Sequence, residues 1–303
     1  MSFVRSFGDD QFQKMKDEPL FKDLLYGAVK EGDVFPALRK NEFDFYHGGG
    51  CLFQYSGKSF KRNPAYDPEI KEKLKSEGKK NVSPISEKAY IERYLKNFTD
   101  TKNYDDFKLK NKEHFSKDGK PRERQYLEPL YGKTYSGDTF PKICVLDIEV
   151  RFNLDGSKKK CDMALLNTIS KEIMFIEAKL FSDPRMSCGE NNREPEVIDQ
   201  VTKYSSLIQS YPEEINEGYK NCIRVTSRLF FNSEIIMTPH IIEDVKLLVY
   251  ETPCDDEIEN NGVYRARKNL KEKIEKAEID TIWIKKQENL SLNEIWDRFT
   301  RKP

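Results

Sequence analysis

Hydrophobic residues along this chain concentrate in three consecutive runs near its middle. The runs span 143–152, 160–168 and 173–180, are rich in β-branched and aromatic residues, and are separated by polar segments at 153–157 and 169–172. Runs of this length, bounded by turn-forming residues, are typical of β-strands. The pattern therefore predicts three strands that follow one another as an antiparallel meander.

Helical spacing of apolar residues replaces this pattern after the third run. It predicts a helix from Pro195 to about Tyr211, and a strand follows at Asp244–Glu251. A helix, a strand and a helix are then expected at 263–277, 281–285 and 290–299. This order indicates an α/β (α+β) fold in which a mixed sheet, with the meander in it, is flanked by helices.

The first part of the chain reads as an addition to that core. The elements expected before the meander are a mainly helical segment at 1–45, a short hairpin at 51–55 with 58–60, and a helix at 86–98, which we count with the main domain. A polar connector rich in Pro and Gly precedes the last of these. We therefore divide the chain into an N-terminal accessory region at 1–84 and a main domain at 85–303. The core of the main domain spans about 143–252, and a C-terminal elaboration follows.

Composition narrows the class of protein. The chain has 303 residues, of which 37% are hydrophobic and 34% charged, as in soluble globular proteins. Its longest apolar runs are far too short for a membrane span, and its first residues do not resemble a secretory signal. The six cysteines are scattered without a C-x-x-C pair, which argues against zinc, an iron–sulfur cluster or a disulfide framework. We expect a cytoplasmic protein without membrane contact.

Turn geometry predicts which residues lie opposite one another in the meander. A two-residue turn at 155–156 makes opposed residue numbers sum to 311, and a turn at 169–170 makes them sum to 339. Glu149 then lies opposite Asp162, and Asp162 opposite Glu177. The same sums pair four sets of apolar residues on the other face: Leu146 with Leu165, Ile148 with Met163, Leu165 with Met174, and Met163 with Ile176. One face is thus expected to pack as core and the other to carry chemistry.

Carboxylates on neighbouring strands repel each other unless a cation lies between them. Hard oxygen ligands without histidine or cysteine favour Mg²⁺ or Mn²⁺ over zinc. Lys179 follows Glu177 by two residues, so its side chain is expected on the same face. There it can hold a phosphate, orient an attacking water or stabilise developing negative charge.

These residues resemble the signature of the PD-(D/E)xK nuclease superfamily, which has the restriction-endonuclease-like fold. The match consists of Asp162 in one strand and Glu177-Ala178-Lys179 closing the next, with Cys161 where the superfamily often has proline. The resemblance implies that Asp162, Glu177 and the carbonyl of Ala178 bind the metal. It also implies that Lys179 serves the hydrolytic water.

A second motif resembles the RecB-type branch of that superfamily. Gln200 and Tyr204 form a Gln-x-x-x-Tyr pattern in the helix that follows the meander. Residues four apart share one helix face. The resemblance implies that this pair helps to position the nucleic acid and the groups of the active site.

The third metal carboxylate has more than one candidate. Register favours Glu149, whereas many superfamily members take this ligand from a helix before the sheet, which here offers Glu87 or Glu92. Asp147 shares the strand face of Glu149 but is expected opposite Ala164, which makes it the weaker choice. The sequence leaves these alternatives open.

The expected function is that of a metal-dependent nuclease, acting on DNA in preference to RNA. Its net charge of zero gives no general attraction to nucleic acid. Basic runs at 58–80 and 102–124, with interleaved aromatic residues, fit either a surface that follows a nucleic-acid backbone or solvated loops. The choice between endonuclease and exonuclease stays open.

The resemblance also suggests a role and partners. The role is the effector of a restriction or anti-phage defence system, and the partner is a helicase, an ATPase or a second copy of the chain. The alternatives are a ribonuclease of the same fold and a non-cleaving nucleic-acid-binding or assembly subunit.

Overall fold

In a computed structural model, the chain forms two compact units, each with its own sheet. The residues that the structure describes are 3–62, 76–77, 85–86, 105–106, 108–109, 123–152, 154, 160–188, 193–251, 270–285 and 288–301. The mixed-sheet unit comprises Met1–Phe3, Lys142–Glu217 and Thr238–Pro303, and the antiparallel-sheet unit comprises Val4–Pro141 and Gly218–Met237. These compact units differ in extent from the functional division at residues 84 and 85, which stays a prediction.

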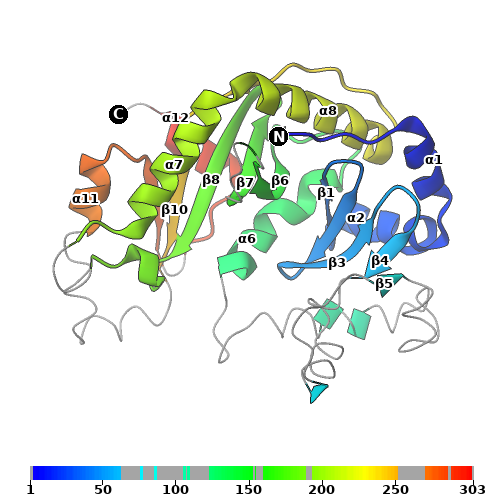
Figure 1. The fold of residues 1–303 in the computed structure, drawn as a ribbon, viewed down its shortest axis with the longest axis horizontal. Coiled ribbons are helices and arrows are strands. Elements are labelled where there is room, and N and C mark those ends of the chain that lie inside the picture. Colours follow the sequence, from blue (N-terminus) through cyan, green and yellow to red (C-terminus); the bar gives the residue numbers. More distant parts are fainter. Residues whose placement is uncertain are drawn as a thin grey trace. The chain divides into compact units, whose positions relative to one another are not determined.

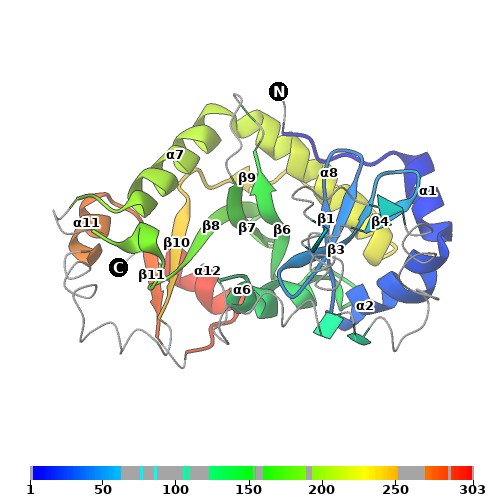
Figure 2. The ribbon, with the colours of Figure 1, turned by 60° about the horizontal axis from the view of Figure 1, so that its bottom comes forward.

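The mixed-sheet unit has the strand order β11-β10-β8-β7-β6 (Figures 1 and 2). The strands are β6 (Ile143–Arg151), β7 (Lys160–Asn167), β8 (Glu172–Leu180), β10 (Lys246–Tyr250) and β11 (Thr281–Ile284). β6, β7 and β8 form the predicted antiparallel meander, whereas β10 and β11 join in parallel. The short strand β9 (His240–Ile241) pairs in parallel with the beginning of β8. The prediction of an α/β fold with a mixed sheet is therefore confirmed.

Helices cover both faces of this sheet. The covering helices are α7 (Glu196–Ser210) and α12 (Leu292–Thr300). The same unit also contains the 3₁₀ helix η4 (Pro184–Met186) between β8 and α7, and α11 (Leu270–Lys276) before β11. Figure 1 shows α7 in front of the sheet and α12 behind it. α12 contacts both β6 and β11, so it crosses the sheet from one edge to the other. The predicted helix at 195–211 and the predicted C-terminal strand and helix are confirmed.

The predicted strand registers are confirmed at the pairs next to Asp162 and Glu177. Asp147 pairs with Ala164 and Ile148 with Met163, and Met163 pairs with Ile176 on the next strand. The pairing predicted for Leu146 with Leu165 is wrong, because Val145 takes that place. A register shift between Val145 and Asp147 leaves Leu146 as an extra residue, which is a β-bulge.

The expectation that one face packs while the other carries chemistry is only partly right. Met163 and Ile176 are fully buried, as predicted for the core face. On the opposite face Ala164 and Phe175 are also fully buried. Tyr204 of α7 lies 6.5 Å from Phe152, whose ring is 5.5 Å from Phe175 (distances between ring centroids). The polar residues of this face therefore lie within a covered apolar layer.

The antiparallel-sheet unit contains a five-stranded meander with the order β1-β2-β3-β4-β5. Its strands are β1 (Phe35–Leu38), β2 (Phe43–His47), β3 (Gly50–Tyr55), β4 (Phe60–Arg62) and β5 (Ile85–Ser86). Its helical segments are α1 (Asp9–Asp17), η1 (Phe21–Leu25), α2 (Tyr26–Glu31), α6 (Glu123–Tyr131) and η3 (Gly132–Tyr135). The predicted hairpin is confirmed as β3 and β4.

The expectation of a mainly helical segment at 1–45 is wrong beyond Glu31. Gly32, with φ of 84°, ends α2 in the left-handed conformation, and β1 and β2 follow. Every residue of these two strands is buried, so they lack the alternation of buried and exposed positions that is typical of a half-buried strand.

The long helix α8 (Pro212–Phe230) was not predicted from the sequence. The boundary between the two units at Glu217 and Gly218 falls within it. The predicted turn at 155–156, the predicted helix after Ser86 and most of the two basic runs lie outside the described residues. In the part of the chain that the structure describes, no helix is both long and apolar enough to cross a membrane.

Candidate functional site

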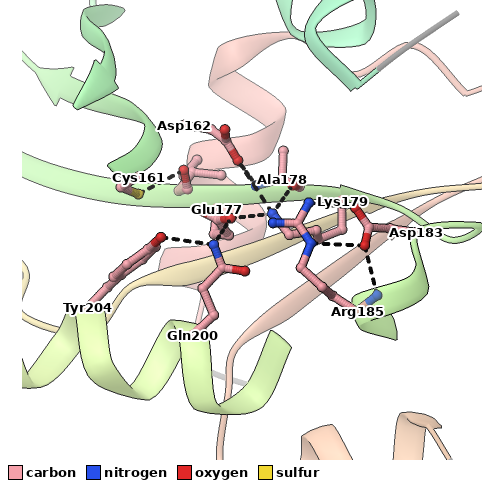
Figure 3. A network of polar contacts seen from close by, with 10 residues as sticks. Cys161, Asp162, Glu177, Ala178, Lys179, Asp183, Arg185, Gln200 and Tyr204 are labelled. Atoms are coloured by element: carbon pink, nitrogen blue, oxygen red, sulfur yellow. Dashed lines mark hydrogen bonds and ion pairs between the residues drawn. The ribbon is translucent and has the colours of Figure 1, made fainter. Parts of the chain in front are cut away.

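Strands β7 and β8 bring Asp162, Glu177 and Lys179 together at the middle of the mixed sheet (Figure 3). The last Cα pair between these strands is Met163 with Ile176, and Asp162 and Glu177 follow at the next position. Oδ2 of Asp162 accepts a hydrogen bond of 2.8 Å from the backbone N–H of Ala178. Central position in the sheet leaves the side chains of Glu177 and Lys179 only 2% and 1% exposed, against 24% for Asp162.

The ammonium group of Lys179 lies among the oxygens that were predicted as metal ligands. Its Nζ donates to Glu177 Oε1 and, over 2.8 Å, to the carbonyl oxygen of Ala178. Oδ2 of Asp162 is 3.8 Å from the same nitrogen. Three oxygens from two strands therefore face one cation, which is the ammonium of Lys179.

Helix α7 adds an amide and a hydroxyl to this cluster. Gln200 Nε2 donates to Glu177 Oε1 over 2.6 Å and contacts Tyr204 Oη at 2.9 Å, as expected for residues four apart on one helix face (Figure 3). α7 is also tied to the entry of β10, because Ser205 Oγ accepts a hydrogen bond of 3.0 Å from Val245 N. The helix is thus fixed to the strands that carry the charged residues.

Burial and charge hold Tyr204 in its neutral form. Burial raises the pKa of Tyr204 to about 12, with the carboxylate of Glu177 adding to the increase and the hydrogen bond from Gln200 opposing it. At neutral pH its hydroxyl therefore keeps its proton. Tyr204 can orient Gln200, but it does not supply a base.

Gln200 has one polar atom that the cluster does not satisfy. Its Oε1 is buried and has no hydrogen-bond partner among the residues that the structure describes. A buried amide oxygen without a partner costs about 1–3 kcal/mol. Such an atom is typical of a site that receives a water, an ion or a substrate group.

Glu149 does not join this cluster. Its Oε2 forms an ion pair of 2.6 Å with Lys160 Nζ, and its backbone takes a left-handed φ of 50°. Among the described residues there is no group of three His, Cys, Asp or Glu side chains placed to hold a metal. The role of Glu149 as the third metal ligand stays a prediction. Its alternatives, Glu87 and Glu92, lie outside the described residues.

The neighbouring thiol is a structural group. Cys161, which stands where the superfamily often has proline, donates its S–H to the carbonyl oxygen of Ile176 over 3.1 Å. Burial raises the pKa of Cys161 well above its usual value, and the negative charges of Glu177 and Asp162 raise it further. A neutral, hydrogen-bonded thiol is neither a nucleophile nor a metal ligand. The departure from the signature therefore leaves the oxygen donors of the site in place.

Asp183 and Arg185, which were not singled out in the sequence, lie at the edge of the site. They belong to the turn and the η4 helix that follow β8, and they form a two-bond ion pair (Figure 3). The signal in the sequence was weak, because 34% of the residues are charged and Asp183-Pro184-Arg185 belongs to none of the motifs recognised there.

The donor set fits a hard divalent cation. Proteins often hold Mg²⁺ by only one or two carboxylates, with waters and substrate phosphate completing the coordination. Asp162 and Glu177 supply two carboxylates, Ala178 supplies a carbonyl, and the ammonium of Lys179 marks the point toward which all three face. Because an ammonium and a metal cation attract the same oxygens, these residues would fit Mg²⁺ or Mn²⁺ if the ammonium of Lys179 moved aside.

Comparison with known proteins gives no independent assignment. No protein-family model, no curated protein and no solved structure matches this chain.

Proposed function

We propose that the chain is a metal-dependent nuclease with a restriction-endonuclease-like core. The reaction is hydrolysis of phosphodiester bonds, in DNA in preference to RNA. The observation that carries the proposal is the convergence of oxygens from Asp162, Glu177 and Ala178 on the buried ammonium of Lys179. The order of meander, helix and parallel strand supports the core assignment.

Each residue of the site has a distinct part in this proposal. Asp162, Glu177 and the Ala178 carbonyl hold Mg²⁺ or Mn²⁺. A metal bound there supplies a coordinated water of lowered pKa and neutralises charge on the scissile phosphate. Lys179 leaves Glu177 and donates a hydrogen bond to the attacking water or to a phosphate oxygen.

Gln200 and Tyr204 on α7 hold the side chains of the site in a fixed orientation. Gln200 donates to Glu177 and so fixes the orientation of that carboxylate, while the neutral hydroxyl of Tyr204 orients Gln200. Gln200 Oε1, which has no hydrogen-bond partner among the described residues, would accept a hydrogen bond from a water or a substrate group. These contacts limit the motion of the ligands, which is the usual task of outer groups at a metal site.

The formal charge of the site supports a metal-dependent reaction. Asp162 and Glu177 carry two negative charges and Lys179 one positive charge, so this part of the site has a formal charge of −1 (−2 + 1). A phosphodiester is also negative and is repelled by such a site. A divalent cation changes the sum to +1, and an anionic substrate then becomes favourable.

The biological role rests on the family resemblance alone. We propose a cytoplasmic effector of restriction or anti-phage defence whose activity is gated by a helicase, an ATPase or a second copy of the chain. Co-purification of the tagged chain from its native host tests this role. An associated motor protein or a dimer supports gating, whereas a monomer that cleaves without any partner contradicts it.

The proposed activity is tested by cleavage of a nucleic-acid panel. Linear and circular DNA, single-stranded DNA and RNA of matched sequence are incubated with the protein, together with any partner that co-purifies with it, in Mg²⁺, in Mn²⁺ and in EDTA. We expect metal-dependent cleavage, lowered at least about 10³-fold by Asp162→Asn, Glu177→Gln and Lys179→Ala. Cleavage of circular DNA identifies an endonuclease.

A matched control lies on the same helix as Gln200. Lys203 and Asp199 form an ion pair of 2.6 Å with side chains 55% and 60% exposed, so Lys203→Gln removes a charge without touching the site. This control should cleave as the wild type does. Cleavage that survives all three site variants would refute the proposal. Cleavage of RNA alone identifies a ribonuclease, and binding without cleavage identifies a non-cleaving subunit.

A further inference from the structure

The turn after β8 holds an arginine in a fixed position. Asp183 N donates to Leu180 O over 2.9 Å, which closes the turn, and η4 begins directly afterwards at Pro184. Asp183 Oδ1 accepts hydrogen bonds from both the backbone N and Nε of Arg185, at 2.8 and 2.9 Å. Its Oδ2 accepts from Arg185 Nη2 at 2.6 Å. The guanidinium is therefore oriented by a fork before any ligand arrives.

This arginine is close to the proposed site. Burial would raise the pKa of Asp183, but the hydrogen bonds and charge of Arg185, with a smaller effect of the charge of Lys179, lower it. The electrostatic effect of Lys179 on Asp183 places the pair near that lysine. η4 also packs against α7, the helix that carries Gln200 and Tyr204. Three consecutive elements, β8, η4 and α7, thus bring Lys179, Arg185 and Gln200 to the same part of the proposed site.

The two cations of this region differ in their access to solvent. The side chain of Lys179 is 1% exposed, whereas that of Arg185 is 41% exposed although Asp183 holds it. A polyanion that approaches the site can therefore reach Arg185 while Lys179 is still covered. A guanidinium already held by one carboxylate retains further N–H donors for a second anion.

We propose that Arg185, positioned by Asp183, binds a backbone phosphate of the nucleic acid next to the scissile bond. This inference rests on the nuclease proposal and adds a residue that selects for a polyanionic backbone. Arg185 binds and positions the substrate and takes no part in proton transfer. Its contribution is independent of base sequence, because every nucleotide presents the same phosphate group.

The inference is tested by measuring binding and cleavage in the full-length protein. Fluorescein-labelled DNA and RNA of one sequence are titrated with protein in Ca²⁺, over a range of salt concentrations, and cleavage is measured in Mg²⁺. Arg185→Gln should weaken binding about tenfold and reduce the slope of log Kd against log salt by about one. KM should rise by a similar factor, with kcat within about twofold of the wild type.

Three further variants separate charge, positioning and stability. Arg185→Lys keeps the charge without the fork, so its loss of affinity should be smaller than that of Arg185→Gln. Asp183→Asn weakens the fork and should give an intermediate loss. Arg298→Gln is the control. Arg298 lies on α12 of the same unit, is 45% exposed and forms an ion pair with Glu288. It should bind as the wild type does.

The outcomes distinguish this inference from the proposed function. If the wild type cleaves and Arg185→Gln keeps the wild-type affinity and salt slope, the inference is overturned while the nuclease proposal stands. A lowered melting temperature with unchanged affinity would show that the ion pair only stabilises the turn, and would also overturn it. If the wild type neither binds nor cleaves any probe, the nuclease proposal itself fails and this inference fails with it.

Discussion

Two buried clusters in this chain are built from the same functional groups but differ in how those groups are satisfied. The β8 cluster consists of Asp162, Glu177, Lys179, Gln200 and Tyr204 in the mixed-sheet unit. The β2 cluster consists of Asp44, Glu42, Arg39, Gln54 and Tyr46 in the antiparallel-sheet unit. Each has one Asp, one Glu, one Gln, one Tyr and one cation. Composition alone therefore cannot identify an active site.

The β2 cluster closes on itself. Asp44 Oδ2 accepts from Arg39 Nε at 3.2 Å and from Tyr46 Oη at 3.3 Å, and its Oδ1 accepts from Gln54 Nε2 at 2.8 Å. The same amide reaches Glu42 Oε1 at 3.2 Å. Both oxygens of the central carboxylate are thus held by hydrogen bonds. The planar guanidinium of Arg39 is also a more rigid partner than an ammonium on a flexible stem.

The β8 cluster is less completely satisfied than the β2 cluster. Gln200 Oε1 is buried without a partner among the described residues, and the side chain of Asp162 is 24% exposed. Its cation is a lysine, whose single nitrogen on a long stem can move away from the oxygens it contacts. The comparison indicates that an incomplete polar network with a movable cation, rather than a buried acid as such, distinguishes the proposed site.

The largest expected difference is in stability, when the central acid of each cluster is removed. Asp44→Ala deletes the acceptor of three hydrogen bonds and should lower the free energy of unfolding by about 3 kcal/mol. Asp162→Ala deletes one backbone hydrogen bond and a contact of 3.8 Å, and should cost about 1 kcal/mol. Urea unfolding measures both. Equal losses would show that the β8 cluster is as closed as the β2 cluster.

A smaller effect is expected from pH in the β2 cluster. Burial, followed by the charge and the hydrogen bond of Asp44, raises the pKa of Glu42 from 4.5 to about 7, although Arg39 and Lys61 oppose the shift. The folded state then holds a proton that the unfolded state has lost, so stability falls as pH rises from about 4.5 to 7.

Glu42→Gln should remove this pH dependence. Above pH 7 the variant should be more stable than the wild type by about 1–2 kcal/mol, after allowance for solvent screening. Thermal unfolding between pH 4 and 8 measures the effect, with Glu243→Gln, an exposed acid of the mixed-sheet unit, as the control. A wild type whose stability rises through this range would contradict the raised pKa.

The smallest expected effect comes from the tyrosine of each cluster. Tyr204→Phe removes one hydrogen bond to Gln200 and should cost about 1 kcal/mol of stability, together with a roughly fivefold loss of cleavage as Gln200 becomes less well oriented. Tyr46→Phe removes a hydrogen bond to Asp44 at a similar cost in stability but should leave cleavage unchanged. If both variants cleave equally well, Tyr204 has no role in positioning.

Much of the mixed-sheet unit could be predicted from the sequence, because its strands are separated by clear turns and its register follows from turn length. The bulge at Leu146 could not be predicted, since neither its composition nor its pattern distinguishes it from its neighbours. α8 was missed although Ile215, Tyr219, Cys222 and Ile223 recur at helical spacing and are buried. β1 and β2 were missed because both are buried at every position, including at polar residues such as Asp44, which a sequence pattern does not reveal.

The members of the β8 cluster and two of its neighbour relations were predictable, but the contacts of its cation were not. Register brought Asp162 and Glu177 to neighbouring positions, and helical spacing joined Gln200 to Tyr204. The position of the Lys179 ammonium among the ligand oxygens depends on side-chain packing that no sequence pattern encodes. The ion pair of Glu149 with Lys160 likewise arises from side-chain geometry rather than from register.

The most direct test of the account is a calorimetric titration of Mn²⁺ into the wild type and three variants. If the oxygens around Lys179 form the metal site, the wild type binds Mn²⁺, and Glu177→Gln loses binding. Lys179→Ala should bind about tenfold more tightly, because it removes the competing positive charge, although it does not cleave nucleic acid. Asp44→Asn, in the β2 cluster, should bind as the wild type does. Failure of both the wild type and Lys179→Ala to bind Mn²⁺ would contradict the account.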